Sequence, residues 1–342
     1  TEAWFIAIVG YALLPLFCAI LIPILFTRFK DLQWLLIIWA ILSILAALKG
    51  FWQKNYGFDT AELYWLFNEG GATTHIIYYG VRYFSFFSDA ANYGIAMGFS
   101  LTVFSISGFF VSSRWVKFLF WSAAIASAYG LMISGTRSAV IIPFVSLAVY
   151  VSLCKNIRYA LLSGGVLITV LLFLTQTHIG NSNALIRRMR STFDKEDASL
   201  QVRYINKEKM KPLMKDKPFG IGLGLSGGRA NRFEIKTKLA ELPPDSLLTM
   251  YWIETGIIGL SLYLTLLVII LIRASYIAMF TIRNKKLKNM MYSFIAGISG
   301  VFVAAYVNDV TTYPNGVLIS ILLAFLFIAP YYDKELVQNE IN

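Results

Sequence analysis

The sequence predicts an all-α integral membrane protein, and three observations support this fold class. Hydrophobic residues make up 57% of the 342 residues and charged residues only 14%, and the mean hydropathy is +0.64. The apolar residues gather in segments of about 20 residues, the length that a helix needs to cross a bilayer. No segment alternates apolar and polar residues as a barrel strand does, so the spans are helices.

About nine segments are apolar enough to span a membrane, and the fifth is the shortest. The expected spans are 3–26, 32–51, 92–112, 116–134, 139–154, 158–179, 246–272, 291–310 and 314–330. The chain begins with Thr1 rather than methionine and enters the first span at once, so we expect N-terminal spans to be missing. Cys18 and Cys154 lie in or at the end of spans and are expected to be small apolar residues without a disulfide.

Basic residues in the short connections predict the orientation. Every second connection is basic, with Lys and Arg at positions 28, 30, 114, 117, 155, 158, 273, 283, 285, 286 and 288. Such connections are typically cytoplasmic, so the net charge of +11 does not indicate nucleic-acid binding. The chain then divides into six spans (1–179), a polar loop outside the cytoplasm (180–245) and three spans with a cytoplasmic tail (246–342).

The turn 134–138, with the sequence Ser-Gly-Thr-Arg-Ser, is the most informative feature. It places Arg137 between two apolar segments, near the edge of the bilayer. A guanidinium there is costly, so it is expected to be paired or to face a polar cavity, and it indicates a functional site. The planar guanidinium suits a phosphate or diphosphate.

Two further connections lie on the same side. Residues 52–91 are rich in aromatic side chains, which indicates an interfacial belt with an in-plane helix near 60–68, or else a path for a lipid-linked sugar. The loop 180–245 is basic, and its charges are either a solvated surface for anionic headgroups or a binding site. Within it, a helix is expected to begin near Arg203, and the Gly-rich turn 219–225 is a weak phosphate-loop signal.

Asp245 is the first candidate base and Glu254 the second, and the histidines are weaker candidates. Asp245 and Ser246 precede the seventh span, where either would also serve as an N-cap. Glu254 lies about 13 Å further along that helix, where a structural ion pair with an arginine is the simplest role. His178 is expected to be interfacial, and the acidic cluster Asp194, Glu196 and Asp197 a solvated patch.

An ordered set of motifs resembles the O-antigen ligase and polymerase superfamily of bacterial membrane glycosyltransferases. The set comprises an Arg82-to-Asp89 segment with Asn92, Ser134–Ala139, Arg203, Pro218–Gly222, Pro243-Pro244-Asp245-Ser246 and Glu254-x-Gly256-x-x-Gly259. It covers residues 80 to 260. Members have about a dozen spans and transfer glycans from undecaprenyl diphosphate at the periplasmic face of the inner membrane.

The resemblance implies roles for particular residues. Arg137 and Arg203, with Arg82, would hold the donor's diphosphate, and Gly222 and Glu254 would belong to the substrate site. Ligases of the family commonly carry a histidine where this chain has Asp245-Ser246, and neither His75 nor His178 occupies that place. Asp245 is therefore expected to act as the base, unless the reaction relies mainly on stabilising the leaving group.

The expected function is an O-antigen ligase that moves polysaccharide from undecaprenyl diphosphate to lipid A core. The alternative is a polymerase that joins repeat units onto a growing glycan. No Asp-x-Asp pair occurs, so metal-independent inverting transfer without a cofactor is expected. Besides these substrates, only membrane lipids are expected as partners, and no nucleic acid. A lipid-linked glycan flippase would place charges in mid-membrane, and a non-catalytic scaffold would not explain Arg137.

Overall fold

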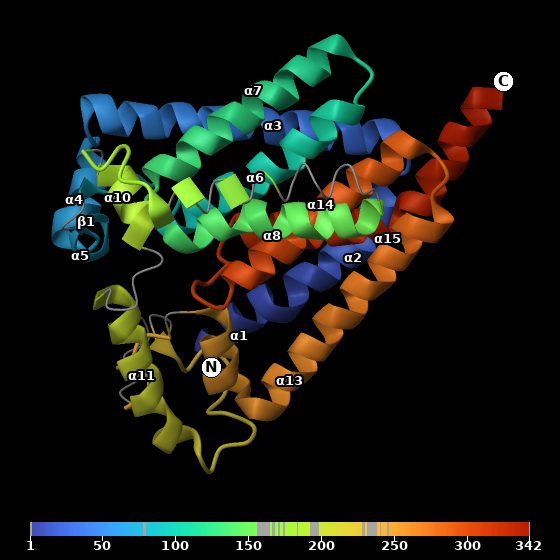
Figure 1. Ribbon diagram of the computed structural model, residues 1–342. Helices are drawn as coiled ribbons and strands as arrows, with labels where there is room; N and C mark the ends of the chain where they lie inside the picture. Colours follow the sequence, from blue (N-terminus) through green and yellow to red (C-terminus); the bar gives the residue numbers. More distant parts are fainter. Residues whose placement is uncertain are drawn as a thin grey trace.

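The protein is a bundle of long apolar helices, which confirms the predicted all-α membrane fold (Figure 1). The computed structural model describes residues 2–77, 80–155, 165, 168–169, 172–173, 175–182, 184–191, 198–227, 230, 238–239, 241–244 and 246–341. Within these residues eight helical segments are long and apolar enough to cross a membrane. The expected span 158–179 lies mostly outside the described residues.

The membrane-spanning elements are, in chain order, α1 (Glu2–Ile8), the π-helix η1 (Val9–Leu13), α2 (Leu14–Leu25), α3 (Phe29–Tyr56), α6 (Ala90–Phe110), α7 (Arg114–Ile133), α8 (Arg137–Cys154), α13 (Leu247–Tyr276), the π-helix η3 (Ile277–Thr281), α14 (Lys285–Ala304) and α15 (Asn315–Ile341). The connections contain α4 (Thr60–Asn68), α5 (Ala72–His75), strands β1 (Ile76–Ile77) and β2 (Gly80–Val81), α10 (Ala184–Arg190) and α11 (Ala198–Met214). The short helix expected near 60–68 is α4.

α6 and α14 form the centre of the bundle, with α3 and α7 above them and α2 below in Figure 1. Both helices are mostly buried along their length. Small residues permit this packing: a Cβ added at Gly300 would lie 2.6 Å from the Ile142 carbonyl oxygen of α8. Lipid supplies no hydrophobic drive between helices, so close backbone approach of this kind holds them together.

Polar residues set the limits of α14, which is shifted toward the N-terminus from the expected span 291–310. The Asn284 side chain accepts hydrogen bonds from the N–H groups of Lys286 (3.0 Å) and Leu287 (3.1 Å), so the helix begins at Lys285. It ends at Ala304, and the connection 305–314 follows. Asn308 and Asp309 therefore lie in a loop rather than in a span.

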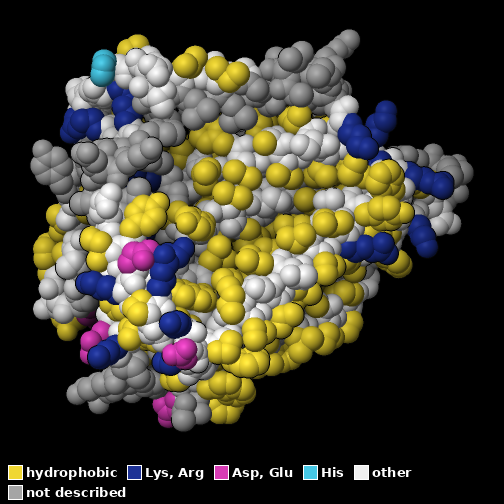
Figure 2. Space-filling view, turned by 60° about the horizontal axis from the view of Figure 1, so that its bottom comes forward, with side chains coloured by type: hydrophobic (Ala, Val, Ile, Leu, Met, Phe, Trp, Pro, Cys, Tyr) yellow, Lys and Arg dark blue, Asp and Glu magenta, His cyan; other side chains and the backbone are white. Residues whose placement is uncertain are grey.

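The connections gather at two ends of the bundle. Residues 82–92, 134–136, 246–247 and 308–315 are joined by hydrogen bonds at one end, which we call the loop end. Residues 26–29, 283–289 and 332–335 meet at the other end. Figure 2 shows charged side chains at the two ends of an apolar surface. This is the pattern of a protein whose middle lies in lipid.

α13 is broken at Gly256, where the segment 218–222 of the preceding loop is hydrogen-bonded into the break. Gly256 has φ +68° and ψ −173°, which is not helical. The N–H groups of Ile221 and Gly222 donate to the carbonyls of Ile253 (2.9 Å) and Glu254 (3.0 Å), and Ile258 donates to Pro218 (3.3 Å). The carbonyls of Ile253 and Glu254 at the break thus accept hydrogen bonds from the loop, and these bonds attach the large loop to the bundle.

We expect Gly256→Ala to lower the free energy of unfolding by about 2–5 kcal/mol, since a Cβ there meets both backbone strain and overpacking. It would lie 2.0 Å from the Pro218 carbonyl oxygen. Gly10→Ala is the matched control, because nothing lies within 4 Å of its added Cβ, and it is expected to change stability by less than about 1 kcal/mol. Thermal unfolding in detergent measures both, and equal melting temperatures would contradict the strain argument.

Candidate functional site

The turn between α7 and α8 is held against the N-terminus of α6. The Thr136 hydroxyl donates to the Ala90 carbonyl (2.7 Å), and the Ser134 hydroxyl accepts from the Thr136 N–H (3.2 Å). Gly94 leaves room for this contact, because a Cβ there would lie 2.6 Å from the Ser134 hydroxyl. Gly135 has φ +58°, a conformation that favours glycine. The small residues of the motif therefore shape a rigid platform for the arginines around it.

Arg82 lies across this turn and its charge is held largely by neutral oxygens. Its guanidinium donates to the Ser134 carbonyl (3.3 Å), the Thr74 carbonyl (3.0 Å) and the Thr136 hydroxyl (3.0 Å). Burial lowers the pKa of Arg82 from 12.5 to about 10; Asp89 opposes this shift, while Arg203 and Arg137 add to it. The side chain stays protonated at neutral pH, so a positive charge is maintained at the turn.

Arg137 and Arg188 approach the turn from α8 and α10. Arg137 is the first residue of α8, and its guanidinium donates to the Ser191 hydroxyl (3.1 Å) and carbonyl (3.3 Å). Arg188 donates to the Gly135 carbonyl. A Cβ added at Gly135 would touch both Arg188 Nε (3.1 Å) and Arg82 Cγ (3.4 Å), so these two side chains flank the same glycine.

Arg203 of α11 completes the group, because its charge acts on Arg82 together with that of Arg137. We call Arg82, Arg137, Arg188 and Arg203 the arginine cluster. The three arginines expected from the sequence are therefore brought together at the loop end. The N-terminus of α8 adds backbone N–H groups and a positive dipole end. Such a concentration of charge-assisted donors suits a diphosphate.

The loop 305–314 reaches the same place from the other side. The Asn308 side chain donates to the Ser138 hydroxyl, next to Arg137. The backbone carbonyl of Asn308 accepts from the Leu247 N–H (3.2 Å). Asp309 follows, and its carboxylate accepts from the N–H (3.0 Å) and hydroxyl (2.8 Å) of Thr311. Through Asn308, this loop links Ser138, next to Arg137, to the start of α13.

The expected base and its neighbours are found at the start of α13. Ser246 is the N-cap, with its hydroxyl accepting from the Thr249 N–H (3.2 Å), so the capping role belongs to Ser246. Asp245 itself lies outside the described residues. The Gly222 N–H donates to the Glu254 carbonyl, as described above. The buried Glu254 carboxylate accepts from the Ser226 hydroxyl (2.6 Å), so its described contact holds the loop to the break in α13.

The remaining candidates are two histidines and an acidic cluster, and the contacts of His75 are those of a structural residue. His75 is buried, with Nε2 accepting from the Ala90 N–H (2.9 Å) and Nδ1 within 2.9 Å of the Gly71 carbonyl. His178 is exposed beside Asn181. The acidic cluster Asp194, Glu196 and Asp197 lies outside the described residues. Within the part of the chain that the structure describes, no three His, Cys, Asp or Glu side chains meet as metal ligands would.

Arg188, Asn308 and Asp309 were missed by the sequence analysis. Arg188 stands among four basic residues between 187 and 195 that look alike in sequence, and only the fold directs it to Gly135. The Asn308-Asp309 pair was assigned to the end of an apolar span. Two polar residues in succession at that end are a signal that the helix stops earlier.

Comparison with known proteins identifies one family for part of the chain. The family model described as O-antigen ligase matches residues 122–264, which confirms the resemblance noted in the sequence. The matched segment runs from α7 through the Arg137 turn and the large loop to the break in α13. Neither the curated proteins nor the solved structures contain a match to this chain.

The pH dependence of the loop end is expected to follow His75. Burial lowers the pKa of His75 from 6.5, the Gly71 hydrogen bond opposes this shift, and the positive charge of Arg82 adds to it. The folded state therefore favours the neutral ring of His75. The stability that this preference contributes is fully present above about pH 6.5 and is lost as the pH falls through the lowered pKa.

Protection factors of the amides of residues 72–77 and 80–90, which correct for the slower intrinsic exchange in acid, are expected to fall as the pH drops below about 6.5, because a protonated Nε2 cannot accept from the Ala90 N–H. The variant His75→Gln should lose this pH dependence of protection, whereas exposed His178→Asn should keep it. Protection factors that fall equally in all three proteins would contradict the assignment to His75.

Proposed function

We propose that this protein, whose residues 122–264 match the O-antigen ligase family, transfers a glycan from undecaprenyl diphosphate to a hydroxyl acceptor. The observation that carries the proposal is the arginine cluster at the loop end, which joins side chains from four separate segments around one turn. The acceptor that fits best is lipid A core, which makes the protein a ligase of the bacterial inner membrane with its site facing the periplasm.

The chemistry asks for stabilisation of the departing diphosphate. A sugar joined through its anomeric carbon to a diphosphate already has a good leaving group, and negative charge on that group grows as the bond breaks. Guanidinium groups positioned in advance stabilise that charge at no cost of reorganisation. Arg82 and Arg188 are fixed by hydrogen bonds to the turn carbonyls of Ser134 and Gly135, so the cluster is oriented before the donor arrives.

A carboxylate would accept the proton of the attacking hydroxyl. Asp245 is the proposed base, since Ser246 already supplies the N-cap of α13. Asp309 is a second carboxylate in the loop 305–314, next to Asn308, whose side chain contacts Ser138 and whose backbone carbonyl contacts Leu247. Proton transfer late in an oxocarbenium-like displacement requires only a weak base. Attack opposite the leaving diphosphate inverts the anomeric carbon, and none of these residues needs a metal ion to act.

A polymerase remains the alternative, because the family histidine is replaced here by Asp245-Ser246. Both functions need the same donor site and differ in the acceptor. A flippase is disfavoured, since the described arginines of the cluster lie at the end of the bundle rather than at its middle.

Glycan transfer in proteoliposomes tests the proposal, with an undecaprenyl-diphosphate-linked glycan as donor and either lipid A core or a second donor as acceptor. We expect product on lipid A core. Arg137→Ala and Arg188→Ala should each lower the rate by about 100-fold or more, as loss of a group that stabilises the transition state does. Arg187→Ala is the matched control: it neighbours Arg188, is exposed and bonds to Asn181 and Ser182.

A ladder of lengthened donor would identify a polymerase. No product with either acceptor, or full activity in both cluster variants, would refute the proposal.

The base is tested by Asp245→Asn and Asp309→Asn in the same assay. Asp245→Asn should lower kcat by about 100-fold or more and remove the acidic limb of the pH–rate profile, with little effect on donor KM. Asp309→Asn should retain most activity. Chelation with EDTA should leave transfer unchanged; inhibition that added Mg²⁺ restores would contradict metal-independent transfer.

A further inference from the structure

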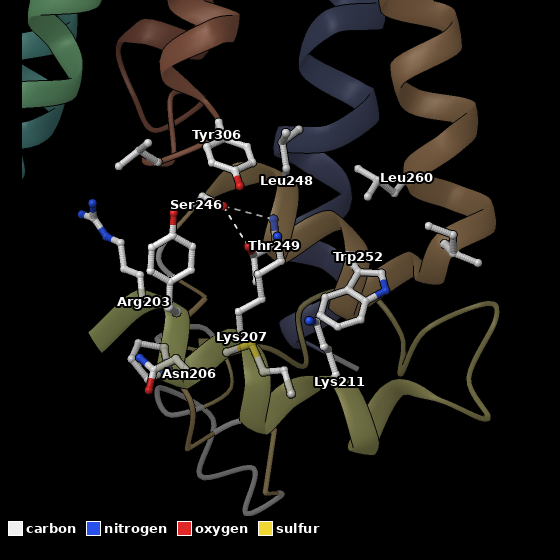
Figure 3. A pocket seen from close by; sticks show the side chains of 15 residues that line it. Arg203, Asn206, Lys207, Lys211, Ser246, Leu248, Thr249, Trp252, Leu260 and Tyr306 are labelled. Atoms are coloured by element: carbon white, nitrogen blue, oxygen red, sulfur yellow. Dashed lines mark hydrogen bonds between the residues drawn. The ribbon is translucent and has the colours of Figure 1, made fainter. Parts of the chain in front are cut away.

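A cavity of about 360 Å³ lies between α11 and the start of α13, next to the arginine cluster (Figure 3). One wall consists of side chains of α11, among them Arg203, Lys207 and Lys211. The facing wall is formed by α13 and by Tyr306 and Val307 of the loop 305–314. The cavity therefore joins the three parts of the chain that surround the proposed site.

The α11 wall is a basic stripe. Arg203, Lys207 and Lys211 are four residues apart, so they lie on one face of the helix and extend over about 12 Å. The Lys207 ammonium lies 5.5 Å from the centre of the Tyr306 ring. Lys211 contacts Glu208 in an exposed pair, and such pairs are worth little. Both ammonium groups can therefore turn to an anionic group in the cavity.

The facing wall is apolar and leads to the lipid-facing surface. Leu248, Trp252, Ile257 and Leu260 of α13 line the cavity. Beyond them, exposed apolar side chains continue along the helix, including Leu262, Leu266 and Ile269. A molecule with phosphate groups and long hydrocarbon chains satisfies both walls at once, with its charge on α11 and its chains on α13.

The positions of Arg203 and Ser246 distinguish the place for the donor from the place for the acceptor. In Figure 3 the Arg203 guanidinium points away from Trp252, and its charge acts on Arg82. Arg203 thus belongs to the cluster that would hold the donor's diphosphate, and the two lysines lie further along α11. Ser246 lines the cavity and directly follows the proposed base, Asp245. A molecule in the cavity would therefore contact both Arg203 of the cluster and Ser246 at the start of α13.

We propose that this cavity binds the acceptor, as a phosphorylated glycolipid. Its phosphate contacts Lys207 and Lys211, and its hydrocarbon chains lie against Trp252 and the outer surface of α13. The inference rests on the proposed transfer reaction and adds to it a site for the second substrate.

The test compares the double variant Lys207→Gln/Lys211→Gln with Lys209→Gln in the proteoliposome assay. Lys209 is on the same helix and exposed but does not line the cavity. With phosphorylated lipid A core as acceptor, the double variant should raise the acceptor KM at least tenfold and leave the donor KM unchanged, while Lys209→Gln changes neither. With dephosphorylated lipid A core, wild type and double variant should have the same acceptor KM.

Binding without turnover gives an independent readout. Detergent-solubilised protein should bind phosphorylated lipid A core in the absence of donor, and the double variant should bind it at least tenfold more weakly. An unchanged acceptor KM in a double variant that still transfers would overturn the acceptor site. A raised donor KM would place the donor's chain in the cavity instead, and lysine-dependent extension of a second donor alone would overturn the glycolipid assignment. Absence of transfer by the wild type would refute the proposed function itself.

Discussion

The positive charge gathered around the turn 134–136 is the constraint around which the loop end is arranged, since the charges of Arg203 and Arg137 both lower the pKa of Arg82. Charges of one sign near a bilayer raise the free energy of the folded protein unless neighbouring groups compensate. Here the described compensation comes from the carbonyls of Ser134, Gly135 and Thr74 and from nearby hydroxyls. Guanidinium groups fixed in this way present charge-assisted donors on one side of the turn, which suits an anionic group.

The break in α13 attaches the large loop, and with it Arg203, to the rest of the bundle. Segment 218–222 is paired with the backbone on both sides of Gly256, and Glu254 holds Ser226. The large loop is therefore anchored to a membrane helix at two points rather than attached only through its ends. Since α11 precedes this anchor by a few residues, the position of Arg203 depends on it. Gly220 and Gly256 permit this close backbone approach, because an added Cβ would lie 2.5 Å from the Glu254 carbonyl oxygen and 2.0 Å from the Pro218 carbonyl oxygen, respectively.

The arginine cluster and the cavity between α11 and α13 are neighbours, and they differ in character. The arginine cluster is built on rigid carbonyls and a helix N-terminus, which suits a compact diphosphate. The cavity between α11 and α13 combines flexible lysines with an apolar surface, which suits an amphiphile of variable shape. Arg203 belongs to both, and Ser246 lines the cavity. Under the proposed function, this difference in character would let two anionic lipid-linked substrates bind at separate places.

The sequence by itself determined the membrane class, the presence and approximate positions of eight apolar helices within the described residues, the short helix α4 and the motif around Arg137. These features are local, because length, hydropathy and capping residues suffice to specify them. Tertiary structure decided the rest. The sequence does not distinguish Arg188 from Arg187; the packing of α10 places Arg188 on Gly135. Asn308 and Asp309 lie in the connection 305–314 because α14 ends at Ala304. The break at Gly256 likewise required a partner some 35 residues earlier in the chain. Contacts between distant segments depend on packing, which no local pattern encodes.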